Sequence, residues 1–386
     1  MDFELNDEQK AYQEAARSFA EKEMTPHAAK WDQEKIFPKD VIAKAGQLGF
    51  CGVYTRTDVG GSGLTRLDGS IIFEELSAGC TSTAAYITIH NMVTWMIDSF
   101  GKESVRTQWC PSMCTGEKLG SYCLSEPNAG SDAGSLRTSA EKKGKTYVLN
   151  GSKAWVSGGR ETDVLVVMAR TGGPGPKGVS SFVVPTTAEG LSFGENEKKM
   201  GWNSQPTRII NFDNVVIREE NLLGEEGMGF KIAMKGLDGG RINIATCSVG
   251  AAQAALNTAQ RYMHERKQFG QTLASFQALQ FKIADMVTDL VASRQMIRLA
   301  AHKLDSKDAN ATTYCAMAKV FATDKCFDIC NQALQIHGGY GYTKEYPLER
   351  HFRDVRVHQI LEGTNEIMRV IVSRKILEDG APALIR

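Results

Sequence analysis

The chain has 386 residues, of which 42% are hydrophobic and 23% are charged. At roughly 150 residues per domain, this length allows about two to three domains with buried cores, and the composition excludes a largely disordered chain. The 45 basic side chains are balanced by 45 acidic ones, so the excess positive charge that nucleic-acid binding requires is missing. No window reaches the roughly 18 consecutive apolar residues of a membrane-spanning helix. We therefore expect neither a nucleic-acid partner nor a membrane span.

The N-terminus and the cysteines bear on the cellular compartment. The stretch from Met1 to Glu4 is acidic and leads directly into a helical pattern, unlike a signal peptide or an Arg-rich transit peptide. A trimmed transit peptide would fit a protein of the mitochondrial matrix, and a bacterial protein would be cytoplasmic. The nine cysteines are scattered and odd in number. This favours reduced thiols packed in the core over disulfides or a metal site.

Residues 1–118 are expected to form a helical domain. Asn6, with Gln9 three positions later, has the capping-box pattern of a helix start. Apolar side chains then recur on one helical face until Pro26. A glycine-rich loop at 60–63 separates these early helices from a second helical stretch.

Residues 119–230 have the pattern of short strands. Asn150 and Gly151 predict a tight turn between two strands, and 172–176 predicts another turn. The β-rich segments of this zone are 147–149, 154–156, 164–168, 181–184 and 208–212. Because no helical pattern separates them, a β-barrel or sandwich is favoured over a parallel sheet with crossover helices.

Residues 231–386 return to helical patterns. The stretch 242–263 is rich in alanine, and 311–334 is helical as well. Between them, 281–304 places four apolar residues on one stripe, Ile283, Val287, Leu290 and Ile297. We therefore expect an α+β multidomain chain with an N-terminal helical domain, a middle β-barrel or sandwich domain, and a C-terminal helical domain similar to a four-helix bundle.

Most familiar catalytic motifs are missing from the sequence. Gly144-Lys145-Thr146 lacks the first glycine of a P-loop, because Ser139 stands at that position. No G-x-G-x-x-G, H-E-x-x-H or G-x-S-x-G motif is present in a fitting context, and the seven histidines show no metal-ligand spacing. Hydrolase, kinase and nicotinamide chemistry are therefore not supported.

Four other segments are dense in Gly, Ser, Thr, Asn, Gln and aromatic residues, where a plain core would be apolar. They are 122–132, 266–277, 335–342 and 359–366. Loops of this composition can hold a polar heterocycle or a phosphate through hydroxyls and backbone N–H groups. In this order and spacing the segments resemble the acyl-CoA dehydrogenase family, and the resemblance covers essentially the whole chain.

The resemblance implies FAD as the cofactor and oxidation of an acyl-CoA thioester between its α and β carbons. It also implies electron-transferring flavoprotein as the electron acceptor and a homo-oligomer, a dimer of dimers. Segments outside the shared motifs, among them 172–178 and 201–208, are similar to the branch that acts on short, branched acyl groups. The alternatives are the same chemistry on a 2-methylbutyryl or straight butyryl thioester, an oxygen-using oxidase, and a catalytically silent family member.

Carried over position by position, the resemblance implies a set of FAD contacts. The flavin ring would be lined by Tyr122, Cys123, Leu124, Ser125, Glu126, Pro127, Asn128, Ala129, Gly130 and Ser131, then by Trp155, Val156 and Ser157. The adenosine diphosphate part would be held, largely from a neighbouring subunit, by Arg266, Phe269, Gln277, Gln335, Ile336, His337, Gly338 and Gly339. An arginine suits a pyrophosphate, and glycines let backbone amides approach it. The cofactor set is completed by Thr364, Asn365 and Glu366.

The resemblance places the catalytic base at Glu362. Such an oxidation needs a base for the α-proton, a donor that stabilises the enolate, and an acceptor for the β-hydride, which in this family is flavin N5. Thr364 can cap the following helix, so that the Glu362 backbone N–H can donate to the thioester oxygen. Taken alone, Glu362 fits a solvated loop glutamate better, and the resemblance reverses this interpretation.

Two opposing effects act on Glu362. A helix N-terminus favours the carboxylate, whereas a water-poor acyl pocket favours the neutral acid, and we expect desolvation to win once substrate excludes water. Some relatives carry the base at the position of Gly240, where a glycine cannot act. The implied substrate contacts are Ser131, Asp238, Gly239, Gly240 and Arg241, with Arg374 near the CoA portion.

Overall fold

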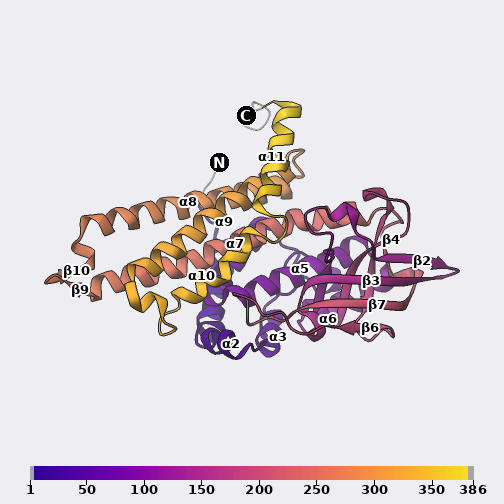
Figure 1. Cartoon of the computed structure of the whole chain (residues 1–386), viewed down its shortest axis with the longest axis horizontal. Helices are drawn as coiled ribbons and strands as arrows, with labels where there is room; N and C mark the ends of the chain where they lie inside the picture. The colour runs from indigo at the N-terminus through magenta and orange to yellow at the C-terminus, as the bar shows by residue number, and fades with distance from the viewer. Residues whose placement is uncertain (1–3, 381–386) are drawn as a thin grey trace.

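The computed structural model describes residues 4–380, in three parts that follow one another along the chain (Figure 1). The first part is helical and contains α1 (Asp7–Phe19), α2 (Ala28–Glu34), α3 (Lys39–Gln47), α4 (Arg66–Gly79), α5 (Thr81–Phe100) and α6 (Glu103–Cys114). The second part contains β1 (Gly120–Cys123), β2 (Ser139–Lys143), β3 (Thr146–Ser157), β4 (Val164–Arg170), β5 (Val179–Pro185), β6 (Leu191–Phe193), β7 (Thr207–Arg218) and β8 (Leu222–Leu223). The third part contains α7 (Gly229–Glu265), β9 (Lys267–Gln268), β10 (Gln271–Thr272), α8 (Gln277–Asp305), α9 (Ala311–Ile336), α10 (Leu348–Arg356) and α11 (Asn365–Asp379). The domain boundaries expected at 118 and 230 stay predictions.

The capping box predicted at Asn6 is present. The side chain of Asn6 accepts a hydrogen bond from the Gln9 N–H at 2.8 Å, and the side chain of Gln9 accepts one from the Asn6 N–H at 3.2 Å. The two bonds satisfy N–H groups that a helix start would otherwise leave unpaired. Deeper in this part, α5 is buried along most of its length and packs against α7 and β1.

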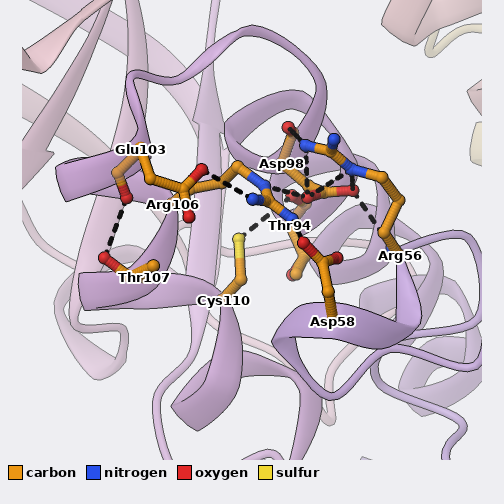
Figure 2. A network of polar contacts seen from close by, with 8 residues as sticks. All are labelled: Arg56, Asp58, Thr94, Asp98, Glu103, Arg106, Thr107 and Cys110. Carbon is orange, nitrogen blue, oxygen red and sulfur yellow. Dashed lines mark hydrogen bonds and ion pairs between the residues drawn. The ribbon is translucent and has the colours of Figure 1, made fainter.

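A charged network anchors the loop that precedes α4 (Figure 2). Asp98, near the end of α5, is buried and accepts hydrogen bonds from Arg106 Nε at 2.7 Å and from Arg56 Nε at 3.1 Å. Arg106 also pairs with Glu103 at 2.8 Å and with Asp58 at 2.6 Å. The network therefore ties Arg56 and Asp58, which precede the glycine-rich loop, to α5 and α6.

The middle part is a mixed sheet with the strand order β6-β7-β3-β2-β4-β5-β8, and β1 pairs with β4 in parallel. Strand β4 is buried on both faces. Val164 and Val166 face residues of α5 and α7, whereas Leu165 and Val167 lie with Phe182 in the core of the sheet. The β-rich middle part between two helical parts, as expected from the sequence, is confirmed.

The turn predicted at Asn150 and Gly151 is wrong. Strand β3 runs through both residues, and the hairpin turn between β2 and β3 lies at Gly144 instead. The register against β7 shifts between Leu149 and Gly151, as in a β-bulge. Gly151 has a φ of 143°, and a β-carbon there would lie 2.6 Å from Thr138 Oγ1. The glycine is therefore needed for a bulge and a close approach, not for a turn.

The long helices α7, α8 and α9 run along the long axis of the molecule (Figure 1). The alanine-rich stretch of α7 is a packing surface, because Ala252, Ala255 and Ala259 are fully buried against its neighbours. The stripe predicted on α8 is partly wrong. Leu290 is buried as expected, but Val287 is 42% exposed, so the buried face of α8 is narrower than the apolar pattern.

All nine cysteines are free and buried, which confirms that they pack in the core. Burial raises the pKa of Cys123 to about 12, so its thiol stays protonated at neutral pH. Over residues 4–380, none of the helices combines the length and the apolar character needed to cross a bilayer.

Candidate active site

A cavity of about 1500 Å³ opens between the middle sheet, α5, α7 and the segment before α11. Many of its wall residues belong to the flavin prediction: Tyr122, Leu124, Ser125, Gly130, Ser131, Trp155, Ser157 and Thr364. Sequence reasoning missed its apolar wall, which comes from two helices and includes Ile89, Met92, Phe230, Met234 and Leu237. Helical periodicity marks such residues only as core, so no sequence signal assigned them to the site.

Trp155 reaches the cavity because β3 is irregular at this point. The pairing of β3 with β7 shifts between Lys153 and Val156, and Trp155 has a φ of 60°. An irregularity of this kind turns a side chain away from its regular face. Trp155 is accordingly 66% exposed at the cavity wall, whereas Val156 is fully buried in the sheet core.

Within the loop 122–131, Glu126 holds the loop itself. Its carboxylate accepts hydrogen bonds from the backbone N–H groups of Arg137 at 2.7 Å and Thr138 at 2.9 Å. It also pairs with the buried ammonium group of Lys153 at 2.8 Å. Glu126 therefore shapes the loop and does not line the cavity. The other predicted loop residues outside the cavity walls are Cys123, Pro127, Asn128 and Ala129.

Glu362 lies at the cavity wall, in the segment between α10 and α11. Its φ is 55° and that of Gly363 is 89°, so two consecutive residues are left-handed. Thr364 then caps α11 by accepting a hydrogen bond from the Ile367 N–H at 3.3 Å, as predicted. Glu362 Oε2 is shielded from solvent and has no hydrogen-bond partner. Gly240 makes room for it, because a β-carbon at that position would lie 1.9 Å from this oxygen.

The surroundings of Glu362 favour the protonated acid. Burial raises its pKa from 4.5 to about 7, although the positive charges of Arg241, Lys319 and Arg66 oppose the shift. Sequence reasoning tied this desolvation to the arrival of substrate, whereas the fold alone already shields the carboxyl group. A carboxyl group with a pKa near neutral pH is suited to take up a proton from a bound molecule.

Two cations hold the backbone of the Glu362 segment. Arg241 of α7 pairs with Asp238 at 2.8 Å, and its Nε–H donates to the carbonyl oxygen of Glu362 at 3.4 Å. Lys319 of α9 is fully buried, and its Nζ donates to the carbonyl oxygen of Gly363 at 2.9 Å. The segment is therefore fixed from two different helices.

A third cation, Arg66, is buried at the start of α4 beside the same site. Its guanidinium carbon lies 3.7 Å from the ring centre of Tyr54 and 5.2 Å from that of Trp95, in cation–π contact. A β-carbon on Gly239 would lie 2.5 Å from Arg66 Nη1. Sequence reasoning missed both Arg66 and Lys319, because a lone charge on a helix predicts a solvated face.

Three family models match the chain in succession: acyl-CoA dehydrogenase N-terminal domain at 6–117, middle domain at 121–215 and C-terminal domain at 227–377. The chain belongs to the acyl-CoA dehydrogenase family. It is 58% identical over 375 residues to isobutyryl-CoA dehydrogenase, mitochondrial, of Bos taurus, with 97% of this chain and 90% of that protein covered. The protein of the same name from Dictyostelium discoideum is 54% identical over 376 residues, with the same coverage. The solved butyryl-CoA dehydrogenase from Megasphaera elsdenii is 38% identical with a TM-score of 0.95, covering 98% of this chain and 100% of that chain.

This acyl-CoA dehydrogenase is FAD-dependent, as its family is, and the cavity fits the cofactor. Its volume of about 1500 Å³ exceeds that of a typical small-molecule pocket, about 300–1,000 Å³, so it has room for a flavin and a thioester. The Tyr122 hydroxyl is buried without a partner. The hydroxyl residues Ser125, Ser131 and Thr364 line the walls, and the indole of Trp155 offers a flat apolar surface. These residues would hold the polar edge and the face of the flavin ring.

The residues predicted for the adenosine diphosphate part of FAD lie elsewhere. The β9–β10 hairpin is at the opposite end of the long axis from the sheet (Figure 1). Phe269 in this hairpin is 93% exposed, Arg266 lies over the ring of Tyr340 at 5.6 Å, and His337 stacks on Tyr262 at 4.1 Å. The remaining members of the set also lie outside the cavity walls: Gln277, Gln335, Ile336, Gly338 and Gly339. Their role in holding the cofactor from a neighbouring subunit stays a prediction.

Only some of the predicted substrate contacts line the cavity. Ser131 and Arg241 line the cavity. Asp238 is buried and orients Arg241 through their ion pair. Arg374 is exposed on α11 outside the cavity walls, and its contact with CoA stays a prediction. Two predicted cofactor residues at the start of α11 also lie outside these walls, Asn365 and Glu366.

Proposed function

We propose that this acyl-CoA dehydrogenase converts isobutyryl-CoA into methacrylyl-CoA, a step of valine catabolism, with Glu362 as the base. The observation that carries the proposal is the buried Oε2 of Glu362, which has no partner and belongs to a residue at the cavity wall. Its pKa of about 7 suits a group that accepts a proton at neutral pH. The choice of substrate is supported by the two mitochondrial relatives named isobutyryl-CoA dehydrogenase.

The proposed first step breaks the bond between the α-carbon and its hydrogen. Glu362 Oε2 takes the proton, and the electron pair stays on the thioester as an enolate. The negative charge collects on the thioester oxygen, to which the backbone N–H of Glu362 donates a hydrogen bond. FAD, when bound, supplies the acceptor for the hydride that leaves the β-carbon. Arg241 holds the Glu362 carbonyl throughout, so the base keeps its direction.

The apolar wall lines the same cavity as Glu362. Met92, Phe230 and Leu237 offer surface to a short acyl group rather than to water. A branched and a straight four-carbon group differ by the place of one methyl group, which a pocket distinguishes by only about 1–3 kcal/mol. The likeness to butyryl-CoA dehydrogenase, with a TM-score of 0.95, makes butyryl-CoA the second candidate.

The proposal includes a homotetramer, a dimer of dimers, that passes electrons to electron-transferring flavoprotein. Helix α8 exposes a row of apolar side chains that an oligomer would cover, Phe281, Val287, Val291 and Leu299. The distance between the cavity and the β9–β10 hairpin also calls for a second copy. We expect sedimentation to report four chains per particle, and a monomer would contradict the proposal. We propose that the enzyme lies in the mitochondrial matrix if the chain is eukaryotic and in the cytoplasm if it is bacterial.

Steady-state rates with isobutyryl-, 2-methylbutyryl- and butyryl-CoA test the substrate. We expect kcat/KM to be about 10-fold or more higher for isobutyryl-CoA, within the range that one methyl placement allows. A preference for butyryl-CoA would favour the second candidate. Admitting air after anaerobic reduction tests the electron acceptor, because an oxidase would reoxidise quickly and release peroxide.

A further inference from the structure

We propose that Lys319 is a positioning residue that holds the Glu362 segment in place and supplies a positive charge that keeps the Glu362 carboxylate ready to accept a proton. The inference rests on the proposed role of Glu362 as the base. Lys319 lies within α9, far along the sequence from the segment it contacts, and no motif marks it. It does not line the cavity and does not touch the reacting atoms.

The contacts of Lys319 point to this role. Its side chain is fully buried, and Nζ donates to Gly363 O at 2.9 Å and to Asn365 Oδ1 at 2.8 Å. Both partners are neutral and both follow Glu362 within three residues. A buried ammonium group is costly without compensating negative charge, and the carboxylates that favour the charged Lys319 include that of Glu362 itself.

The backbone of the segment needs to be held. Glu362 is a non-glycine residue with a φ of 55°, followed by Gly363 with a φ of 89°. A non-glycine residue in the left-handed region persists only where its surroundings enforce it. Here Arg241 from α7 holds the carbonyl of Glu362, and Lys319 from α9 holds the next carbonyl. The two helices thus fix the turn that aims the carboxyl group at the cavity.

Lys319 also contributes a positive charge near the Glu362 carboxyl group. The charged and titratable groups that act on Glu362 come from α4, β1, α7 and α9, and they are Arg66, Tyr122, Arg241, Cys247 and Lys319. Burial raises the pKa values of the tyrosine and the cysteine, so these two stay neutral. Arg241 opposes the raised pKa of Glu362 most strongly, although it is also paired with Asp238. Burial lowers the pKa of Lys319 to about 8, whereas the carboxylates of Glu362, Asp324 and Glu366 oppose this shift. Lys319 is therefore still charged at the pH where Glu362 ionises.

The test compares three variants of the holoenzyme with the parent. Lys319→Met removes both the bonds and the charge, Lys319→Gln keeps a donor without the charge, and Lys319→Arg keeps the charge. The matched control is Lys325→Met on the same helix, where Lys325 is 42% exposed and pairs with Asp289 at 3.1 Å. Two quantities are measured: the pH midpoint of anaerobic flavin reduction by isobutyryl-CoA, and hydrogen exchange of the backbone amides at 361–366.

We expect Lys319→Met to move the midpoint upward by about one pH unit, because a nearby positive charge that favoured the carboxylate is lost. Exchange at 361–366 should become at least about tenfold faster, since the hydrogen bond to Gly363 O is gone. Lys319→Gln should shift the midpoint by a similar amount with less loss of protection, and Lys319→Arg should restore the midpoint. Lys325→Met should match the parent in both measurements.

An unchanged midpoint in both Lys319→Met and Lys319→Gln would overturn the proposal. If Lys319→Met does not fold, the pair Lys319→Gln and Lys319→Arg decides the question by the same midpoint. A separate arm, Glu362→Gln, distinguishes this failure from failure of the proposed function. Normal flavin reduction in Glu362→Gln would show that Glu362 is not the base. If Glu362→Gln blocks reduction but the Lys319 variants keep the parent midpoint, only the proposed role of Lys319 is wrong.

Discussion

Glu362 Oε2 lies so close to Gly240 that a β-carbon on the glycine would be 1.9 Å from it. Because Gly240 on α7 has no side chain, it leaves the space that the Glu362 carboxyl group occupies. The preceding residue, Gly239, does the same for Arg66, whose Nη1 would lie 2.5 Å from a β-carbon there. Two consecutive glycines therefore admit the carboxyl group and a cation side by side against one helix.

Gly240→Ala should displace the base without unfolding the protein. The new methyl group would meet the end of a flexible side chain, so Glu362 can move away, and alanine favours a helix interior by about 0.5–1 kcal/mol. We expect anaerobic flavin reduction to slow by about 100-fold or more, as for a misplaced catalytic group. Thermal unfolding should change little, and a parent-like reduction rate would refute the account of this contact.

Gly250→Ala is the matched control on the same helix. A β-carbon there would lie 2.2 Å from the backbone oxygen of Glu74, which cannot swing away. This overpacking should destabilise the fold by about 1–3 kcal/mol or more. The reduction rate per folded molecule should stay near that of the parent.

The raised pKa of Glu362 also affects stability. The folded-state pKa is about 7 and the unfolded value is about 4.5. The native state therefore binds this proton more tightly, and the stabilisation is complete below about pH 4.5 and lost as pH rises through 7. Glu362→Gln should gain stability relative to the parent over this window, by up to about 3 kcal/mol above pH 7. Denaturant unfolding at several pH values measures the difference, and a pH-independent difference would argue against a perturbed Glu362.

Thr364→Ala should weaken the start of α11. The Thr364 side chain accepts a hydrogen bond from the Ile367 N–H, and loss of such a cap costs about 0.5–2 kcal/mol. Thr364→Ser keeps the hydroxyl and should lose only a small part of this. Denaturant unfolding distinguishes the two, and equal losses in both variants would show that the cap does not contribute.

The network around Asp98 makes a prediction that concerns stability alone. Burial raises the pKa of Asp98, but hydrogen bonds from Arg56 and Arg106 outweigh this, and the net pKa lies below 3.8. The stabilisation is therefore present at neutral pH and is lost as pH falls through the lowered pKa. Asp98→Asn should destabilise the protein by about 2–4 kcal/mol at pH 7, because Arg106 is left buried beside a neutral group.

The control for this network is Asp58→Asn. The Asp58 side chain is 58% exposed, so its pair with Arg106 should contribute less than about 1 kcal/mol. Neither Asp98→Asn nor Asp58→Asn should move the pH midpoint of flavin reduction. A large loss of stability in Asp58→Asn would mean that the exposed Asp58 pair contributes much of the network's stabilisation.

Local patterns predicted the ends of helices better than the paths of strands. The capping box at Asn6 and the cap at Thr364 depend on a few neighbouring residues, so the sequence alone predicts them. Asn150 and Gly151 match a turn equally well, yet β3 runs through them with a bulge, where Thr138, just before β2, approaches Gly151 closely. Such a contact between distant residues is invisible to a local pattern.

The candidate site divides in the same way. A sequence motif identified Glu362 as a site residue, and the structure buries its Oε2 at the cavity wall. Lys319 and Arg66 lie on helices and come to the site only through packing, so no spacing rule could find them. The burial that raises the pKa of Glu362 was expected from bound substrate, whereas the folded chain alone already raises it to about 7.

In the proposed reaction the carboxyl group of Glu362 removes the α-proton. Rapid anaerobic mixing of isobutyryl-CoA with FAD-loaded Glu362→Gln, followed through the flavin absorbance, tests it most directly. Glu378→Gln, an exposed residue on α11, is the control. We expect Glu362→Gln to keep the parent flavin spectrum but to bleach at least about 1,000-fold more slowly, while Glu378→Gln bleaches at the parent rate. Bleaching of Glu362→Gln at the parent rate would contradict the account.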